Sequence, residues 1–183
     1  MSVPDEQLML AYAGGDAGAF DSLYGRHKGA LFRFVLRSVK ARGEAEELFQ
    51  EIWMRVIEAR SRYAPQAKFT TWLYTIAHNR LVDHWRAKGL ALVSLDDEDA
   101  SIAEPAAGPD AEPHHVVVAR ETLDRLSAAI AALPLAQREA FLLHTESGLT
   151  VSEIAAATGS GEEAAKSRLR YAMGKLREAI GDD

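Results

Sequence analysis

The sequence predicts an all-α protein in which a flexible acidic linker joins two small helical domains. Apolar residues recur at spacings of three and four on both sides of the middle of the chain, which is the period of amphipathic helices. Between them, SLDDEDASIAEPAAGPDAEP holds three of the six prolines and no sustained apolar period. Such a segment cannot bury enough surface to offset its ordering entropy. We therefore expect domains at residues 1–90 and 116–183 and a linker at residues 91–115.

Composition limits the class of protein. The chain has 183 residues, 48% of them hydrophobic, which is enough to give one or two small domains a core. It has no cysteine, and this excludes disulfide frameworks, thiolate metal sites and thiol nucleophiles. No stretch approaches the roughly 18 apolar residues of a membrane span, and the N-terminus does not resemble a signal peptide. We expect a cytoplasmic protein without membrane insertion of its own.

The net charge of -6 argues against a nucleic-acid partner only if it is spread evenly, and it is not. Residues 88–121 hold eight acidic and two basic side chains, which accounts for the whole net charge. Basic residues of the two domains can therefore gather on particular faces. For the linker, flexibility is the plain interpretation. An additional role, in which its charge imitates nucleic acid and occupies a basic channel of a partner, stays open.

Three helices are expected before residue 62. The first covers residues 5–13 and ends at Gly14 and Gly15, and Asp16 is placed to cap the second helix. Arg42 and Gly43 are expected to end that second helix. The third helix, near residues 44–61, contains AEELFQEIWMRVIEA. Its inward stripe is predicted at Leu48, Ile52 and Val56.

The stretch FTTWLYTIAHNRLVDHWRAK, residues 69–88, predicts a fourth helix after a loop at residues 62–68. At about 100° per residue, its core stripe comprises Phe69, Trp72, Leu73, Ile76 and Ala77. Arg80 and Asp83 continue the stripe one turn apart, so we expect them to pair with each other. Asn79 and Arg86 lie beside it. Aromatic rings interleaved with basic residues are typical of single-stranded nucleic-acid binding, and the stacking candidates are Tyr63, Trp72 and Trp85.

The C-terminal part predicts a helix-turn-helix. Thr150 with Glu153 and Ser160 with Glu163 each match a capping box, so two helices should begin there. The first covers residues 151–158, and Gly159 supplies the turn. The second carries five basic residues and no acidic one between positions 166 and 177, so its polar face can enter a major groove. Its buried side is predicted at Leu169, Ala172, Met173 and Leu176.

Two other classes of protein stay open at this point. An autonomous helix-turn-helix regulator, which binds duplex DNA without polymerase, explains the C-terminal half alone. A metal-dependent hydrolase would depend on His78, Asp83 and His84, or on the pair at positions 114–115. No Ser-His-Asp pattern, phosphate-binding glycine loop or paired catalytic carboxylates are recognisable. We therefore expect no enzyme, no catalytic residue, no metal and no cofactor.

The order of EAEELFQEIWMRVI, FTTWLYTIAHNRLVDHWR, an acidic linker, LPLAQREAFLLHTESGLTVSEIAAATG and KSRLRYAMGKLRE resembles RNA polymerase sigma factors of the extracytoplasmic-function (ECF) type. The resemblance covers roughly residues 5–88 and 116–180. It implies a sigma factor that binds core RNA polymerase, directs it to specific promoters and assists promoter melting. The implied partners are the β′ clamp and β subunits of polymerase, promoter DNA and an anti-sigma factor.

The resemblance also implies three sets of site residues. The polymerase-binding set is Glu47, Leu48, Gln50, Glu51 and Trp53. The set for the -10 promoter element is Tyr63, Lys68, Trp72, Asn79, Arg80, Asp83 and Arg86. The set for the -35 element is Lys166, Ser167, Arg168, Arg170 and Tyr171. Two stretches depart from the family's common pattern: GEEAA opens the reading helix, and Tyr171, Ala172 and Met173 stand where Arg-Ala-Arg is frequent.

Overall fold

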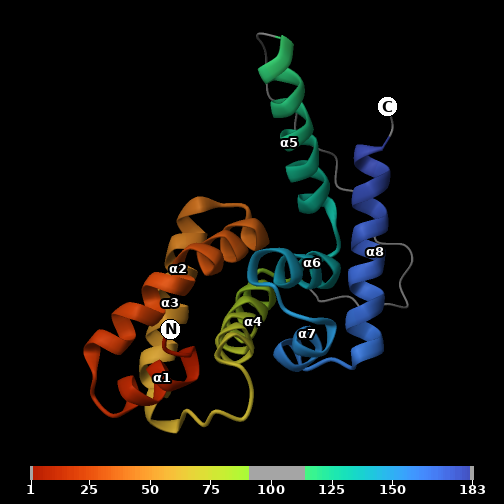
Figure 1. Cartoon of the computed structure of the whole chain (residues 1–183). Helices are drawn as coiled ribbons and strands as arrows, with labels where there is room; N and C mark the ends of the chain where they lie inside the picture. The colour runs from red at the N-terminus through yellow and green to blue at the C-terminus, as the bar shows by residue number, and fades with distance from the viewer. Residues whose placement is uncertain (1, 91–113, 182–183) are drawn as a thin grey trace.

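The structure, a computed structural model, describes residues 2–90 and 114–181, which form helices and turns without any strand (Figure 1). The N-terminal module comprises α1 (Asp5–Ala13), α2 (Ala17–Val39), α3 (Arg42–Ala59), the 3-10 turn η1 (Arg60–Arg62) and α4 (Phe69–Ala87). The C-terminal module comprises α5 (His114–Ala132), α6 (Leu135–Ser147), α7 (Val151–Thr158) and α8 (Glu162–Ile180). The all-α prediction is confirmed. The expected linker lies mostly outside the described residues.

Local signals set the helix ends of the N-terminal module. The Asp16 carboxylate accepts hydrogen bonds from the backbone N–H groups of Gly18 (2.9 Å) and Ala19, so the predicted cap is confirmed. Helix α2 ends because Lys40 adopts a positive φ of 68°. The expectation that Arg42 and Gly43 end this helix is wrong, since Arg42 is the first residue of α3.

Helix α4 is buried along two faces because it packs between α3 and α7. Phe69, Leu73 and Ala77 are fully buried, as the predicted stripe requires, whereas Trp72 is only half-buried. Tyr74 is also buried, on the opposite side of the helix, and burial raises the pKa of its phenol. An amphipathic pattern reveals only one buried face. The Tyr74 side lies edge-on to Phe34 of α2, with 5.3 Å between ring centroids, and α7 of the C-terminal module also packs on α4.

The C-terminal module contains the predicted helix-turn-helix, α7 and α8, with Gly159 in the left-handed conformation between them. The capping box of Thr150 and Glu153 is confirmed at the start of α7. The second predicted box is wrong, because Gly161 is the N-cap of α8 and Ser160 instead contacts the Thr158 hydroxyl at 3.0 Å. Helix α5 already begins at His114, inside the segment expected to be linker.

The inward side of α8 is only partly as predicted. Ala172 and Leu176 are buried, and Leu169 is half-buried. Met173 is 40% exposed, so its prediction as a buried residue is wrong. Ala165 is fully buried instead. The stripe that packs α8 is therefore narrower than the pattern suggests, and more of the helix surface is left open.

The two modules pack against each other, α6 on α2 and α7 on α4, and a single apolar cluster includes residues of both (Figure 1). Arg138 on α6 is buried, and its guanidinium donates to the carbonyls of Ile130, Ala131 and Leu133 and, across the junction, to that of Ser38 (3.1 Å). Burial lowers the pKa of Arg138, but four carbonyl acceptors satisfy the buried cation.

Candidate nucleic-acid and polymerase interfaces

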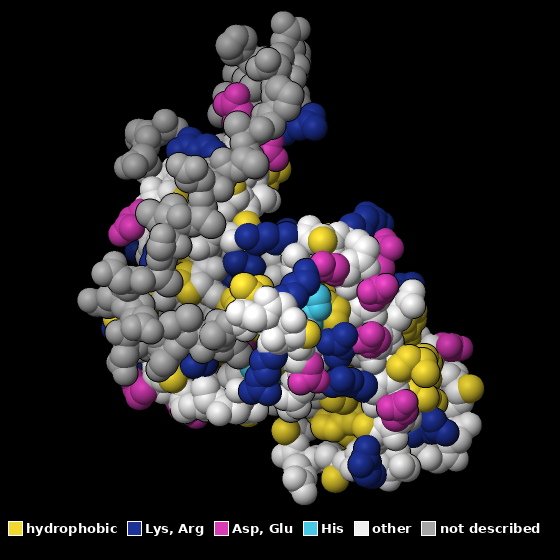
Figure 2. Space-filling model, turned by 180° about the vertical axis from the view of Figure 1, so that it is seen from behind, with side chains coloured by type: hydrophobic (Ala, Val, Ile, Leu, Met, Phe, Trp, Pro, Cys, Tyr) yellow, Lys and Arg dark blue, Asp and Glu magenta, His cyan; other side chains and the backbone are white. Residues whose placement is uncertain are grey.

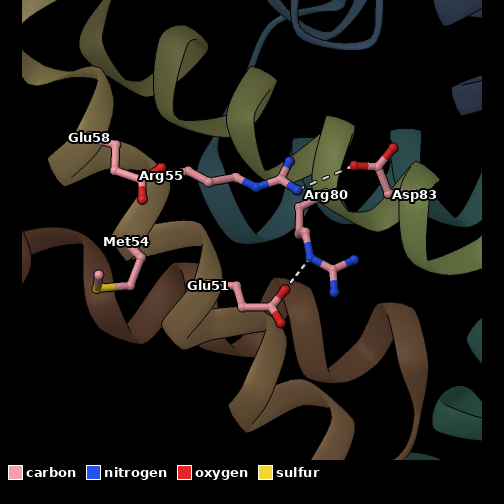
Figure 3. Close-up of a pocket in the computed structure, with 6 residues that line it drawn as sticks. All are labelled: Glu51, Met54, Arg55, Glu58, Arg80 and Asp83. Atoms are coloured by element: carbon pink, nitrogen blue, oxygen red, sulfur yellow. Dashed lines mark hydrogen bonds and ion pairs between the residues drawn. The ribbon is translucent and has the colours of Figure 1, made fainter.

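Side chains of α3 and α4 cross-link the two helices around an open hollow of about 440 Å³ (Figure 3). Arg80 of α4 donates to Glu51 of α3, and Arg55 of α3 lies 3.3 Å from the Asp83 carboxylate of α4. The expected pairing of Arg80 with Asp83 is therefore wrong, because each finds its opposite charge on α3. The hollow is lined by Glu51, Met54, Arg55, Glu58, Arg80 and Asp83.

This arrangement brings together two residue sets that the sequence treats separately. Glu51 belongs to the predicted polymerase-binding set and Arg80 to the predicted -10 set, and they contact each other directly. Met54, which is 54% exposed, and Arg55 were missed, although both lie on the same helix as the predicted contacts. The hollow therefore lies where the two predicted surfaces meet.

The predicted polymerase-binding set on α3 divides into exposed and buried members. Glu47, Gln50 and Glu51 are exposed. Leu48 and Trp53 are 2% and 5% exposed, so they are core residues and not surface contacts. Trp53 packs against the rings of Phe20 and Tyr24, with centroid distances of 5.8 and 5.0 Å. The aromatic expected on the surface is thus part of the α1–α3 core.

Two of the three stacking candidates are also buried. Tyr63 and Trp85 are 8% and 3% exposed, which contradicts their prediction as open platforms for nucleic-acid bases. Tyr63 lies edge-on to Trp72 at 5.0 Å between centroids, and burial raises the pKa of the Tyr63 phenol. Trp72 is half-buried and also contacts Phe69. It is the one candidate of the three whose ring is still partly accessible.

The polar members of the -10 set differ in how they are engaged. Asn79 and Arg86 are exposed on α4. Lys68, just before α4, forms a 2.7 Å ion pair with Glu153 of α7. This pair raises the pKa of Lys68 and is the largest cause of the lowered pKa of Glu153, with the Thr150 backbone N–H adding to it. A predicted DNA contact is therefore occupied by the helix-turn-helix.

Helix α8, which is predicted to read the -35 element, presents a more open surface. Lys166 has a side chain 66% exposed, and Tyr171 is 46% exposed with the Arg170 guanidinium 5.2 Å from its ring centroid. Ser167 and Arg168 are half-buried. The Arg168 Nε is buried without a hydrogen-bond partner among the described residues. Three members of the -35 set are thus exposed, although Lys166 lies 3.9 Å from the Glu163 carboxylate of its own helix, and two are recessed.

The residues proposed for a metal site do not come together. His78 contacts Glu139 at 2.6 Å, Asp83 faces Arg55, and His84 lies 3.4 Å from Glu44. In the part of the chain that the structure describes, no three potential metal ligands are grouped, and no helix is long and apolar enough to cross a membrane.

An exposed basic helix in a helix-turn-helix, joined to a helical module with an aromatic and basic helix, defines a DNA-binding protein of the transcription class. Comparison with known proteins identifies the family within this class. The chain matches Sigma-70 region 2 over residues 23–90 and Sigma-70, region 4 over residues 123–176. It is 33% identical over 174 residues to RNA polymerase sigma factor CarQ of Myxococcus xanthus, covering 95% of this chain and 96% of that protein.

The chain therefore belongs to the RNA polymerase sigma factors of the ECF type. The ECF sigma factor SigK of Mycobacterium tuberculosis is 28% identical over 176 residues, which is 96% of this chain and 92% of SigK. The resemblance seen in the sequence is confirmed, and so is the prediction of a polymerase-binding sigma factor. An autonomous regulator is not supported, because both sigma regions are matched.

Two solved structures share the fold. CnrH in complex with the cytosolic domain of CnrY has a TM-score of 0.71, 22% identity and 98% coverage of both chains. The sigma factor RpoE in complex with the anti-sigma factor NepR from Bartonella quintana has a TM-score of 0.67 and 24% identity, covering 90% of this chain and 98% of that one. These likenesses show that the helical arrangement is one that sigma factors adopt.

Proposed function

We propose that this ECF sigma factor acts without covalent chemistry, by lending core polymerase two DNA-reading modules, residues 1–90 and 116–183. The proposal rests on two helices that lie on separate modules. Helix α4 has the half-buried Trp72, and helix α8 has an exposed basic face. The C-terminal module reads the -35 duplex. The N-terminal module captures bases of the -10 element that leave the stack, which offsets part of a melting cost of a few kcal/mol per step.

The residue roles follow from exposure. Glu47, Gln50 and Glu51 form the polymerase-binding surface toward the β′ clamp, and the family places the β subunit nearby. Base capture falls to Trp72, Asn79 and Arg86, supported by Lys68, Arg80 and Asp83 once these exchange their present partners. Duplex reading falls to Lys166, Arg170 and Tyr171, with Ser167 and Arg168 behind them. The protein works in the cytoplasm, where polymerase is.

Control by a protein partner is part of this proposal. The two related structures described above each contain a sigma factor with a second protein, which the Bartonella quintana structure names as an anti-sigma factor. By this likeness, an anti-sigma factor that covers polymerase-binding surfaces is the expected regulator.

Run-off transcription with purified core polymerase on a library of genomic fragments tests the proposed function. Discrete transcripts that require the protein are expected, and their start sites yield the promoter elements. A Glu47→Lys variant should lose core polymerase in pull-downs, because charge reversal on the exposed face of α3 repels a basic partner. Asp21→Lys, the same reversal on α2, is the matched control. Absence of transcripts, or equal retention of both variants, would contradict the proposal.

A further inference from the structure

The charge pairs that join the two modules all have the same polarity. Within the described residues, four such pairs are present, each with its basic group on the N-terminal module and its carboxylate on the C-terminal module. They are Arg33–Glu146 (2.8 Å), Arg37–Glu146 (2.5 Å), Lys68–Glu153 (2.7 Å) and His78–Glu139 (2.6 Å). We call Arg33, Arg37, Lys68 and His78 the covered face, and Glu139, Glu146 and Glu153 the facing carboxylates. The covered face thus carries two arginines, a lysine and a histidine, each in contact with a carboxylate of the C-terminal module.

The facing carboxylates are recessed, while the arginines are half open to solvent. The Glu139 and Glu146 side chains are 3% and 8% exposed, whereas those of Arg33 and Arg37 are 55% and 50% exposed. Two guanidinium groups converge on one carboxylate at Glu146, and planar guanidinium groups bind phosphate oxygens with the same geometry. The covered face therefore suits a string of phosphates as well as it suits carboxylates.

The covered face shares Lys68 with the predicted -10 contacts. Lys68, Asn79 and Arg86 are eleven and seven residues apart, so at about 100° per residue they lie on one line along the helix. Asn79 and Arg86 are exposed, but Lys68 is paired with Glu153. The Lys68 side chain is still 68% exposed, so a strand that follows this line competes with Glu153 for it.

We propose that the covered face binds the sugar-phosphate backbone of promoter DNA, and that the facing carboxylates occupy it until DNA displaces them. The proposal rests on the proposed function and adds Arg33, Arg37 and His78 to the DNA contacts. On the face of the molecule shown in Figure 2, Lys and Arg side chains are interspersed with Asp and Glu, without a broad uninterrupted basic patch among the described residues. Release of the facing carboxylates would leave the basic groups of the covered face free to bind DNA phosphates.

The proposal predicts that loss of Glu146 and loss of its partners Arg33 and Arg37 change the affinity for single-stranded DNA in opposite directions. The probe is a fluorescent 30-nucleotide single strand of mixed sequence, and anisotropy with the full chain is measured over a range of salt concentrations. Glu146→Gln frees both arginines and should bind the strand about fivefold more tightly, because a larger share of the protein has the face open. Adding Arg33→Gln and Arg37→Gln to Glu146→Gln should lower affinity again. The salt slope should fall by about 0.7 for each arginine lost.

The triple variant removes charge from both sides of the pair, so no buried carboxylate is left unpaired to unfold the protein. The matched control is Arg26→Ala, an α2 arginine whose carboxylate partner, Asp5, lies in its own module. It should leave the salt slope unchanged. If the triple variant binds the strand as tightly as Glu146→Gln, the arginines contact only Glu146 and the proposal is overturned. Binding of this strand needs no polymerase, so the result is independent of run-off transcription.

Discussion

The two helices proposed to read DNA, α4 and α8, differ in which side chains already contact their predicted DNA-binding residues. Helix α4 is packed between α3 and α7, and its predicted contacts Lys68 and Arg80 are engaged by Glu153 and Glu51. On α8, Lys166 lies 3.9 Å from Glu163 of its own helix with its side chain 66% exposed, and Arg170 and Tyr171 are exposed as well. The helix proposed to read the duplex is therefore exposed, whereas the helix proposed to read the strand is held by carboxylates of other helices.

This difference fits the order in which the two ligands become available. Duplex DNA exists before polymerase acts, but unstacked bases appear only after melting, which costs a few kcal/mol per step. Under the proposed function, internal carboxylates on the strand-reading surface also protect it from non-specific polyanions, because any competitor must first displace them. We infer that the contact between the modules delays strand capture until promoter DNA and polymerase are both in place.

The largest expected effect comes from fixing the modules in contact. Lys40 and Ser127 line one hollow of about 330 Å³ between α2 and α5, and the chain has no cysteine of its own. Cross-linking Lys40→Cys to Ser127→Cys with a cleavable bis-maleimide should lower run-off transcription about 100-fold or more, because the modules can no longer bind both elements at once. Elements centred about 25 base pairs apart are separated by about 85 Å at 3.4 Å per pair.

Duplex binding through α8 should persist in the cross-linked protein, and cleavage of the linker should restore transcription. The same double variant before cross-linking is the control for the substitutions themselves. Full transcription by the cross-linked protein would mean that the modules need not separate. The contact between the modules would then not be what delays strand capture by α4.

The next largest effect is expected at Arg138, which joins the modules from a buried position. Arg138→Met keeps much of the volume but leaves four carbonyl groups without their donor, which should cost about 3–5 kcal/mol of folding free energy. All three tryptophans, at positions 53, 72 and 85, lie in the N-terminal module. Circular dichroism therefore reports on both modules, and tryptophan fluorescence on one.

A lower midpoint by circular dichroism with unchanged fluorescence would show that the modules unfold separately. Equal shifts in both signals would show that they unfold as one unit. Arg177→Met, at an exposed position near the end of α8, is the matched control. An unchanged circular dichroism midpoint would contradict the structural role assigned to Arg138.

Features that depend on neighbouring residues in the chain were predictable from the sequence. Asp16 and the Thr150–Glu153 box cap their helices as predicted, because each acts on backbone groups two or three residues away. The box at Ser160 failed although the pattern matched. One extra residue, Gly161, takes the N-cap position, so the local pattern was right about a helix start and wrong about its first residue.

Features that depend on a second element could not be predicted in the same way. Trp53 and Trp85 are buried because other helices cover the sides on which they lie, and a helical period gives no information on what packs there. Likewise, Arg80 forms its ion pair with Glu51 on α3 and not with Asp83, one turn away on its own helix. The polarity of the pairs between modules follows from tertiary packing, and no sequence spacing signals it.

A smaller effect is expected on α8. Lys166→Ala and Arg170→Ala should each weaken duplex binding and lower the salt slope by about 0.9 if each releases one counterion from DNA. Lys175→Ala is the matched control, since it removes a charge nine residues further along, on the opposite side of the helix from Lys166. A salt slope equal to that of the wild type in both test variants would place duplex recognition on another part of the protein. Helix α8 could then no longer be contrasted with α4 as the duplex-reading helix.

The smallest effect is expected from the pH dependence of the Lys68–Glu153 pair, which is exposed on the Lys68 side and screened by salt. The pair lowers the pKa of Glu153, so its contribution to the contact between modules is present above the ordinary glutamate pKa of about 4.3 and is lost as pH falls through the lowered value. It also raises the pKa of Lys68, so the same contribution is present below about 10.4 and is lost as pH rises through the raised value.

Energy transfer between dyes on the two modules measures this contact, with Lys68→Gln as the comparison because it leaves the Thr150–Glu153 capping box intact. The difference between wild type and Lys68→Gln should be constant between about pH 5 and pH 9 and should disappear at lower pH, where Glu153 is protonated in both proteins. A difference that persists at acid pH would mean that Lys68 holds the modules together by packing and not by charge. Glu153 would then not be the group that keeps Lys68 from DNA.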